Sequence, residues 1–295
     1  MKSPLNRKNK IALVHFMAML SMVRWYNILA LFTGLTLFSV FVLNNSSQWM
    51  ITLTDINLFW MLSGMCFVIM SGYIINAFYD VEKDLVNNAK STVFGKHVSK
   101  RKSFNLYFAF NTIGVLLGAL VNWKMAIFQS AFIFVLWFYS HKLRKMPVVG
   151  EISASLLLLV PFGCITAYYK GFDEIVVLYL GFLFAIEFTR EIVKKLEVLR
   201  GDIIYAYGSI ATLLGERKTK WVVIAIMIIT LCLIGALHPI VRDNIYTMLF
   251  LVITSISLIV ASVLLIKAES PIHYSRIQFI YKVILGLAIV CIVFV

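Results

Sequence analysis

Nine long apolar segments run through the 295-residue chain and restrict its fold more than any other feature. A helix needs about 20 mostly apolar residues to cross the roughly 30 Å of hydrocarbon in a bilayer. The segments that approach this length are 26–43, 57–78, 104–122, 125–140, 151–168, 174–190, 221–238, 246–266 and 277–295. We therefore expect an all-α integral membrane protein with about nine transmembrane helices, forming one polytopic membrane domain over residues 1–295.

The composition agrees with a chain that has lipid as its solvent. Hydrophobic residues make up 61% and charged residues only 14%, with a mean hydropathy of +0.90, whereas soluble domains are roughly a quarter charged. The apolar run at 11–22 is too short to span and is expected to lie along the interface before the first crossing. No small-residue cleavage site follows it, which argues against a signal peptide.

The formal net charge of +13 carries a topology signal. If the N-terminus is cytoplasmic, 23 of the 27 Lys and Arg fall in cytoplasmic segments, and only Lys124, Lys170 and Arg242 fall outside, with Lys282 in the last span. This positive-inside bias predicts a multi-pass protein with a cytoplasmic N-terminus, which we place in a bacterial inner membrane. The same charges could instead form a basic face for anionic membrane lipid. Because no basic domain exists apart from these loops, no nucleic-acid partner is expected.

The cysteines and histidines do not predict a metal or disulfide framework. All four Cys lie inside apolar spans without CxxC spacing, and none of the five His pairs with another at i+4.

The acidic residues gather at two matching places. Only 14 Asp and Glu are present, and the ends of the second and sixth spans carry two clusters: Asn76 with Asp80, Glu82 and Asp84, and Glu187 with Glu191, Glu197 and Asp202. Four spans separate the clusters, so both emerge on one side, the cytoplasmic side by the charge count. This arrangement predicts two pseudo-equivalent halves, at about 24–145 and 146–295.

The first cluster has the spacing of an oxygen site on one helix face. Asn76, Asp80 and Asp84 lie at i, i+4 and i+8, within roughly 80° of arc at about 100° per residue. Two carboxylates and an amide are ligands suited to Mg²⁺, which also favours phosphate oxygens. The alternative is a helix end in water whose acids are merely solvated, although Asp is costly at membrane depth.

The second cluster is less regular. A continuous helix would present Glu191, Lys195, Val198 and Asp202 on one face, and only two of these four can ligate a metal. Gly201 could end the helix early, so that Asp202 approaches from a turn. The alternative is interfacial charge pairing, for example of Glu191 with Lys194 or Lys195.

Several motifs resemble one known family. The segment 76–84 resembles the NxxxDxxxD motif of the UbiA-type intramembrane prenyltransferases, and 190–202 resembles their second acidic motif. The segments 24–27, 139–150 (YSHKLRKMPVVG) and 214–218 (LGERK) are similar to further family motifs in the same order. The residue pattern of the second motif is most similar to that of the family branch that transfers a geranylgeranyl group to a glycerol-phosphate lipid.

The resemblance implies nine helices around a central cavity, with prenyl diphosphate and Mg²⁺ bound near the cytoplasmic side. It implies that Asp80 and Asp84 hold Mg²⁺ with support from Asn76, and that Glu191 and Asp202 serve a second ion. Lys142, Arg144 and Lys194 would then contact the prenyl diphosphate. The first two, in a short inside loop, could equally be topology determinants.

The chain departs from the family pattern in two places. The family's second motif carries Asp where this chain has Lys195 and Val198, and the loop at 87–91 lacks the family's proline and arginine. One hypothesis is that Lys195 acts as a fixed ammonium in place of one ion's charge and binds diphosphate as a point charge. The competing hypothesis is that catalysis has been weakened or lost.

Three functions follow. We expect a prenyltransferase that moves a polyprenyl group, with Mg²⁺, from a prenyl diphosphate to a lipophilic acceptor, either a glycerol-phosphate lipid or an aromatic ring. A catalytically reduced homologue could instead serve as a prenyl-lipid-binding or membrane-assembly subunit. A transporter is the third possibility, but it predicts ionisable groups in the middle of several spans, whereas the acids here gather at helix ends.

Overall fold

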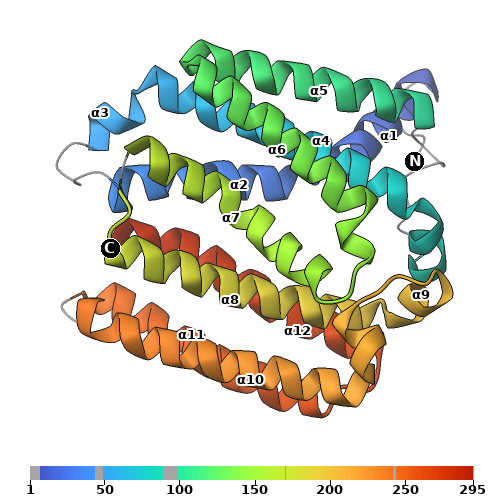
Figure 1. The fold of residues 1–295 in the computed structure, drawn as a ribbon, viewed down its shortest axis with the longest axis vertical. Coiled ribbons are helices and arrows are strands. Elements are labelled where there is room, and N and C mark those ends of the chain that lie inside the picture. The colour runs from blue at the N-terminus through green and yellow to red at the C-terminus, as the bar shows by residue number, and fades with distance from the viewer. Residues whose placement is uncertain (1–6, 44–48, 89–98, 170, 242–243, 295) are drawn as a thin grey trace. The chain divides into compact units, whose positions relative to one another are not determined.

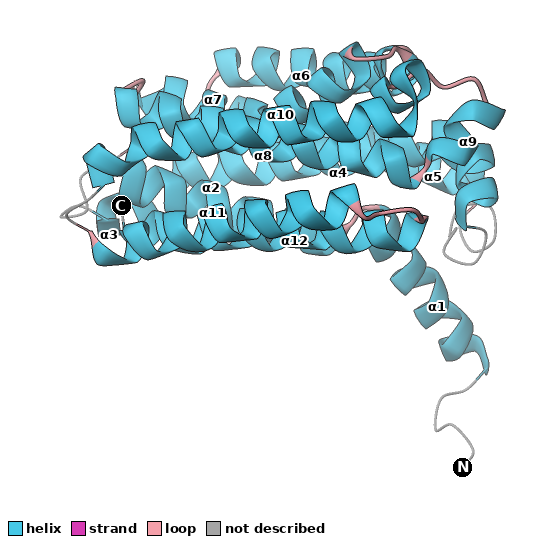
Figure 2. Cartoon of the chain, turned by 90° about the horizontal axis from the view of Figure 1, so that it is seen from below, coloured by secondary structure: helices cyan, strands magenta, loops and turns pink. Residues whose placement is uncertain are grey.

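The computed structural model describes residues 7–43, 49–88, 99–169, 171–241 and 244–294, and every regular element in these ranges is helical (Figures 1 and 2). The elements are α1 (Arg7–Met22), α2 (Trp25–Leu37), the π-helical turn η1 (Phe38–Val42), α3 (Trp49–Leu53), α4 (Ile56–Asn88), α5 (Lys100–Val121), α6 (Trp123–His141), the 3₁₀ turn η3 (Leu143–Lys145), α7 (Val149–Tyr169), α8 (Glu174–Glu197), α9 (Leu199–Ile204), α10 (Ile210–Val241), α11 (Ile245–Ile266), α12 (Pro271–Cys291) and the 3₁₀ turn η4 (Ile292–Phe294).

The helix lengths confirm the all-α membrane class. Among the described residues, eight helical stretches are long and apolar enough to cross a membrane, one fewer than the nine expected. The missing one is α8, the sixth expected span. It is 24 residues long, but its second half carries Glu187, Arg190, Glu191, Lys194, Lys195 and Glu197. Charged side chains lower the mean hydropathy of that helix, so nine is only an approximate count.

The chain divides into two compact units. The first comprises Met1–Phe32 and Ile56–His141, and the second comprises Thr33–Asp55 and Lys142–Val295. The second unit thus includes the segment 33–55, which the expected halves at 24–145 and 146–295 assign to the other half. Whether the halves are pseudo-equivalent stays a prediction.

In the first unit, α4 packs against both α5 and α6 (Figure 1). Glycines allow the close approach: a Cβ at Gly64 of α4 would lie 2.5 Å from Nε2 of Gln129 on α6, and one at Gly118 of α5 would clash with the same side chain. In a bilayer the hydrophobic effect does not drive helices together, because lipid tails are as apolar as the side chains. Small residues at the contacts let the helices approach closely enough for dispersion attraction to hold them together. This packing fixes the helix that carries the first acidic cluster.

The short helix α1 meets this bundle at its C-terminal end. Ala18 and Met22 are buried in a cluster with Ile74 of α4 and Tyr107 of α5. The chain then turns at Arg24, which has a positive φ of 52°, and enters α2. The interfacial position expected for 11–22 stays a prediction.

In the second unit, α8 packs against α7, α10 and α12, and α11 packs against α10 and α12 (Figures 1 and 2). The buried face of α8 carries Phe182, Ile186 and Ile192, each almost inaccessible. Apolar packing along this helix leads directly to the charged residues at its C-terminal end. The second acidic cluster is therefore held by a well-packed element.

Candidate active site

The first acidic cluster lies on one unbroken helix. Because α4 continues from Ile56 to Asn88, Asn76, Asp80 and Asp84 occupy the i, i+4 and i+8 positions that the sequence predicts. Asp80 is buried, with 4% of its surface exposed, and Asn76 is half-buried. The side chain of Asp84 lies outside the described part of the structure.

A cation lies beside this face of α4. The Arg24 guanidinium sits 5.1 Å from the centre of the Tyr73 ring, within the range of a cation–π contact. Tyr73 precedes Asn76 by three residues, so at about 100° per residue it falls at an angle between those of Asp80 and Asp84. The turn at Arg24 thus places a positive charge on the side of α4 that carries the acids. The sequence singled out Arg24 only as part of a motif.

The second acidic cluster is built on a broken helix. Helix α8 ends at Glu197, Val198 has a non-helical conformation (φ −101°, ψ 15°), and α9 begins at Leu199. The expectation of one continuous helical face is therefore wrong, and so is a break at Gly201, which lies inside α9. The Asp202 amide donates a hydrogen bond to the Val198 carbonyl over 3.1 Å, so a short helix carries this carboxylate.

Cations of α8 already hold two of its carboxylates, those of Glu187 and Glu191. Lys194 Nζ donates to both carboxylate oxygens of Glu191, at 2.9 Å each, and Arg190 Nη2 reaches Glu191 Oε1, also at 2.9 Å. Arg190 Nε donates to Glu187 Oε2 at 2.7 Å. The charge pairing of Glu191 with Lys194, considered from the sequence as an alternative to a metal site, is confirmed.

Lys195 lies inside the protein next to Asp202. Its Nζ is 3.8 Å from Asp202 Oδ2, with 5% of Lys195 and none of Asp202 exposed. A buried charge is stable only when an opposite charge or hydrogen bonds compensate for lost hydration. Lys195 therefore faces the carboxylate that the resemblance assigns to a second metal ion.

The two clusters differ in how well they fit Mg²⁺. The α4 face offers the oxygen donors of an amide and a carboxylate, with Asp84 at the next position of the same helix, which suits a hard cation. At the second cluster the carboxylates meet ammonium and guanidinium groups instead. Within the described residues, no group of three or more His, Cys, Asp or Glu side chains is arranged to hold a metal ion. The acids of the second cluster are thus already paired with protein groups, which makes them a poorer match to a divalent cation than the oxygen donors on α4.

The basic loop with Lys142 and Arg144 lies in the second unit, between α6 and α7. Lys142 is exposed and Arg144 half-buried. The loop is tied to the segment after Asp202, because the Gly208 amide donates to the Lys145 carbonyl at 2.9 Å. A Cβ at Gly208 would lie 2.5 Å from Pro147, so only glycine fits this contact.

Glu151 completes the tie between the two loops. It is fully buried at the start of α7, and its Oε1 accepts a hydrogen bond of 2.8 Å from the Ile210 amide at the start of α10. We call this contact, together with the Gly208–Lys145 bond, the loop clasp. Sequence reasoning missed Glu151, since an acid in the first turn of a helix is common and its partner lies 59 residues away.

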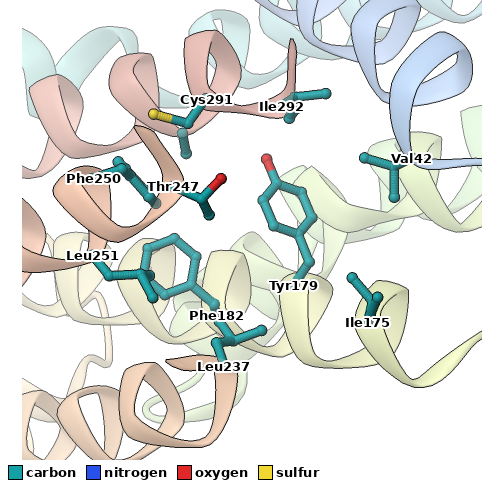
Figure 3. A pocket seen from close by; sticks show the side chains of 11 residues that line it. Val42, Ile175, Tyr179, Phe182, Leu237, Thr247, Phe250, Leu251, Cys291 and Ile292 are labelled. Carbon is teal, nitrogen blue, oxygen red and sulfur yellow. The ribbon is translucent and has the colours of Figure 1, made fainter. Parts of the chain in front are cut away.

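A cavity in the second unit lies away from the charged cluster. It has a volume of about 40 Å³ and an almost wholly apolar lining, into which Tyr179 and Thr247 bring hydroxyl groups (Figure 3). Tyr179 precedes Glu191 by 12 residues, roughly 18 Å along α8. Pockets for small molecules usually measure roughly 300–1,000 Å³, so this cavity is too small for a prenyl chain.

Comparison with known proteins identifies the family to which this fold and these motifs belong. The model of the UbiA prenyltransferase family matches residues 35–283, so the chain belongs to the UbiA prenyltransferase family. A curated relative, the digeranylgeranylglyceryl phosphate synthase of Saccharolobus solfataricus, is 25% identical over 276 residues, covering 90% of this chain and 95% of the relative. The same-named protein of Korarchaeum cryptofilum is 26% identical over 207 residues, which are 68% of this chain and 72% of that protein.

Solved structures share the fold. One described as digeranylgeranylglyceryl phosphate synthase in membranes has a TM-score of 0.68 at 20% identity, covering 95% of this chain and 97% of that one. A UbiA homolog from Archaeoglobus fulgidus bound to GPP and Mg²⁺ has a TM-score of 0.66 at 15% identity, covering 94% and 100%. The relatives are largely archaeal and give no support to the bacterial membrane expected from the sequence. The cytoplasmic N-terminus stays a prediction.

Proposed function

We propose that the protein transfers a prenyl group from a prenyl diphosphate to a lipophilic acceptor in a Mg²⁺-dependent reaction. Family membership and the family motifs support the reaction class. The fold neighbour from Archaeoglobus fulgidus that binds GPP and Mg²⁺ supports the donor and the metal.

The observation that carries the proposal is the burial of Asp80. This carboxylate is 4% exposed on a helix long and apolar enough to span the membrane, and it shares a face with Asn76. Burying an ionisable group costs free energy even at the end of an apolar span, so such residues generally serve a function. Asn76, Asp80 and Asp84 would hold Mg²⁺ through oxygen atoms.

The chain's own residues would prepare the donor for ionisation. Mg²⁺ held on α4 would supply charge neutralisation for the departing diphosphate. Lys142, Arg144 and Lys194 would bind diphosphate oxygens through charge-assisted hydrogen bonds, and the loop clasp would hold the first two in place. Apolar helices would exclude water, so that the acceptor and not water attacks the allylic cation.

The acceptor we propose is a glycerol-phosphate lipid that already carries one geranylgeranyl chain. The basis is the name shared by the curated relatives, digeranylgeranylglyceryl phosphate synthase, together with the wording of the second motif. An aromatic ring is the other acceptor class that the same donor chemistry allows.

The test is transfer of a labelled geranylgeranyl group by purified protein in nanodiscs, offered geranylgeranylglyceryl phosphate and an aromatic acceptor in parallel. We expect product with Mg²⁺ and none with EDTA. Asp80→Asn should abolish transfer, whereas Asp173→Asn, a matched change at an exposed residue before α8, should leave it intact. Equal activity of the two variants would contradict the proposal.

A second candidate function is favoured by Lys195 and Val198, which stand where the family's second motif carries Asp. A reduced homologue would bind prenyl lipid or a membrane partner without turnover. It predicts that the protein binds geranylgeranyl diphosphate but forms no product with either acceptor. Transport, the third possibility from the sequence, has no such observation in its favour.

A further inference from the structure

Bases on α8 balance three of the four acids of the second acidic cluster, and the fourth, Glu197, accepts a hydrogen bond from Gln278. Three acids, Glu187, Glu191 and Asp202, stand against three bases, Arg190, Lys194 and Lys195, and each acid has one of these bases within ion-pair distance. Divalent cations bind where carboxylates leave negative charge for the ion to neutralise. No such excess is present among these six side chains.

The geometry opposes an added ion as well. Mg²⁺ requires near-octahedral oxygen ligands at about 2.1 Å, and both oxygens of Glu191 already accept hydrogen bonds from Lys194. At Asp202 an ion would compete with the Lys195 ammonium, 3.8 Å from the carboxylate. Two like charges so close together in a buried site would repel each other.

The Lys195 side chain is held inside the protein and does not extend to solvent. The residue is 5% exposed although a lysine stem is long enough to carry its charge outward from many buried positions. Val198 removes another oxygen donor and marks the break between α8 and α9, and Lys195 Nζ lies 3.8 Å from Asp202 Oδ2 across this break. The ammonium is therefore a fixed part of the site.

We infer that the second acidic motif of this protein is a metal-free site in which Lys195 supplies the charge of a second divalent ion, so that prenyl diphosphate binds with one metal ion per chain. This inference rests on the proposed function. Lysine is a compact point charge that binds phosphate without demanding a fixed ligand geometry. The α4 face then holds the single ion.

The experiment counts bound ions without requiring turnover. Wild-type protein in nanodiscs is saturated with geranylgeranyl thiolodiphosphate, an unreactive donor analogue, and titrated with Mn²⁺ while free Mn²⁺ is followed by electron paramagnetic resonance. We expect one tightly bound Mn²⁺ per chain, lost in Asp80→Asn. Two tightly bound ions in the wild type would overturn the inference alone, whereas failure to bind the analogue would overturn the proposed function with it.

A charge-restoring variant gives the second arm. Lys195→Asp combined with Val198→Asp supplies the carboxylates that the family motif carries, and it should raise the count from one ion to two. Lys267→Asp, a charge reversal at an exposed residue elsewhere in the same unit, should leave the count at one. If the double variant folds and still binds one Mn²⁺, the inference is contradicted. If the double variant does not fold, the number of Mn²⁺ ions bound by the wild-type protein decides between one and two metal ions.

Discussion

The acidic face of α4 and the cluster on α8 and α9 carry similar acids at matching places in the sequence, yet they are built differently. On α4 one unbroken helix lines up Asn76, Asp80 and Asp84. At α8 the helix breaks at Val198, and Lys194 and Lys195 hold Glu191 and Asp202. We propose that direct pairing of the acids with Lys and Arg side chains, and not the number of acids, decides whether a motif can take a metal ion.

The largest expected effect is a difference in prenyl-transfer activity between variants at the α4 face and variants at the cluster on α8 and α9. Asp80→Asn removes a buried charge from the proposed metal site and should lower the rate of prenyl transfer by at least about 100-fold, as losses of key electrostatic groups do in enzymes. Asp202→Asn, at the cluster that already contains its own cation, should cost much less. Initial rates at saturating Mg²⁺ measure both, and equal losses would break the comparison.

The next effect concerns stability at the second cluster. Lys195→Ala leaves Asp202 buried without its ammonium and should lower the free energy of unfolding by about 3–5 kcal/mol. Adding Asp202→Ala should restore part of this loss, because the two residues are coupled. Thermal unfolding in detergent measures the cycle, with Lys124→Ala at an exposed site as the control. Strict additivity would show that the pair does not interact.

A smaller effect tests the loop clasp, which lies within the second unit. Glu151→Ala leaves the Ile210 amide without its acceptor and should cost about 1–3 kcal/mol, whereas Glu151→Gln keeps an acceptor oxygen and should cost less. Glu174→Ala, at the exposed start of α8, is the matched control. The same melting temperature for all three variants would argue against the clasp.

The smallest effect comes from the backbone of the same loop. Val148 has a φ of 67°, a left-handed conformation that costs a residue with a Cβ roughly 1–2 kcal/mol. Val148→Gly should therefore be neutral or raise the melting temperature slightly. Val149→Gly, in the first turn of α7, should lower it, since glycine in a helix costs about 1 kcal/mol. A lower melting temperature for Val148→Gly than for Val149→Gly would contradict this account.

The sequence predicted what depends on local pattern. Apolar length located the helices closely, as with 104–122 against the observed Lys100–Val121, and four-residue spacing put Asn76 and Asp80 on one face. The sequence pattern did not predict contacts between segments that are far apart in the chain. The bond from Ile210 to Glu151 joins residues 59 apart, and no periodicity marks it. The break at Val198 was also missed, because glycine at 201 is the stronger stop signal by propensity and valine is not one.

The claim that only the α4 face holds a metal is tested most directly by anomalous scattering from crystals grown with Mn²⁺ and the thiolodiphosphate analogue. The account predicts one manganese peak, within ligand distance of Asn76, Asp80 and Asp84, and Lys195 Nζ in contact with a phosphate oxygen. A second manganese peak coordinated by Glu191 and Asp202, with Lys195 displaced, would contradict it.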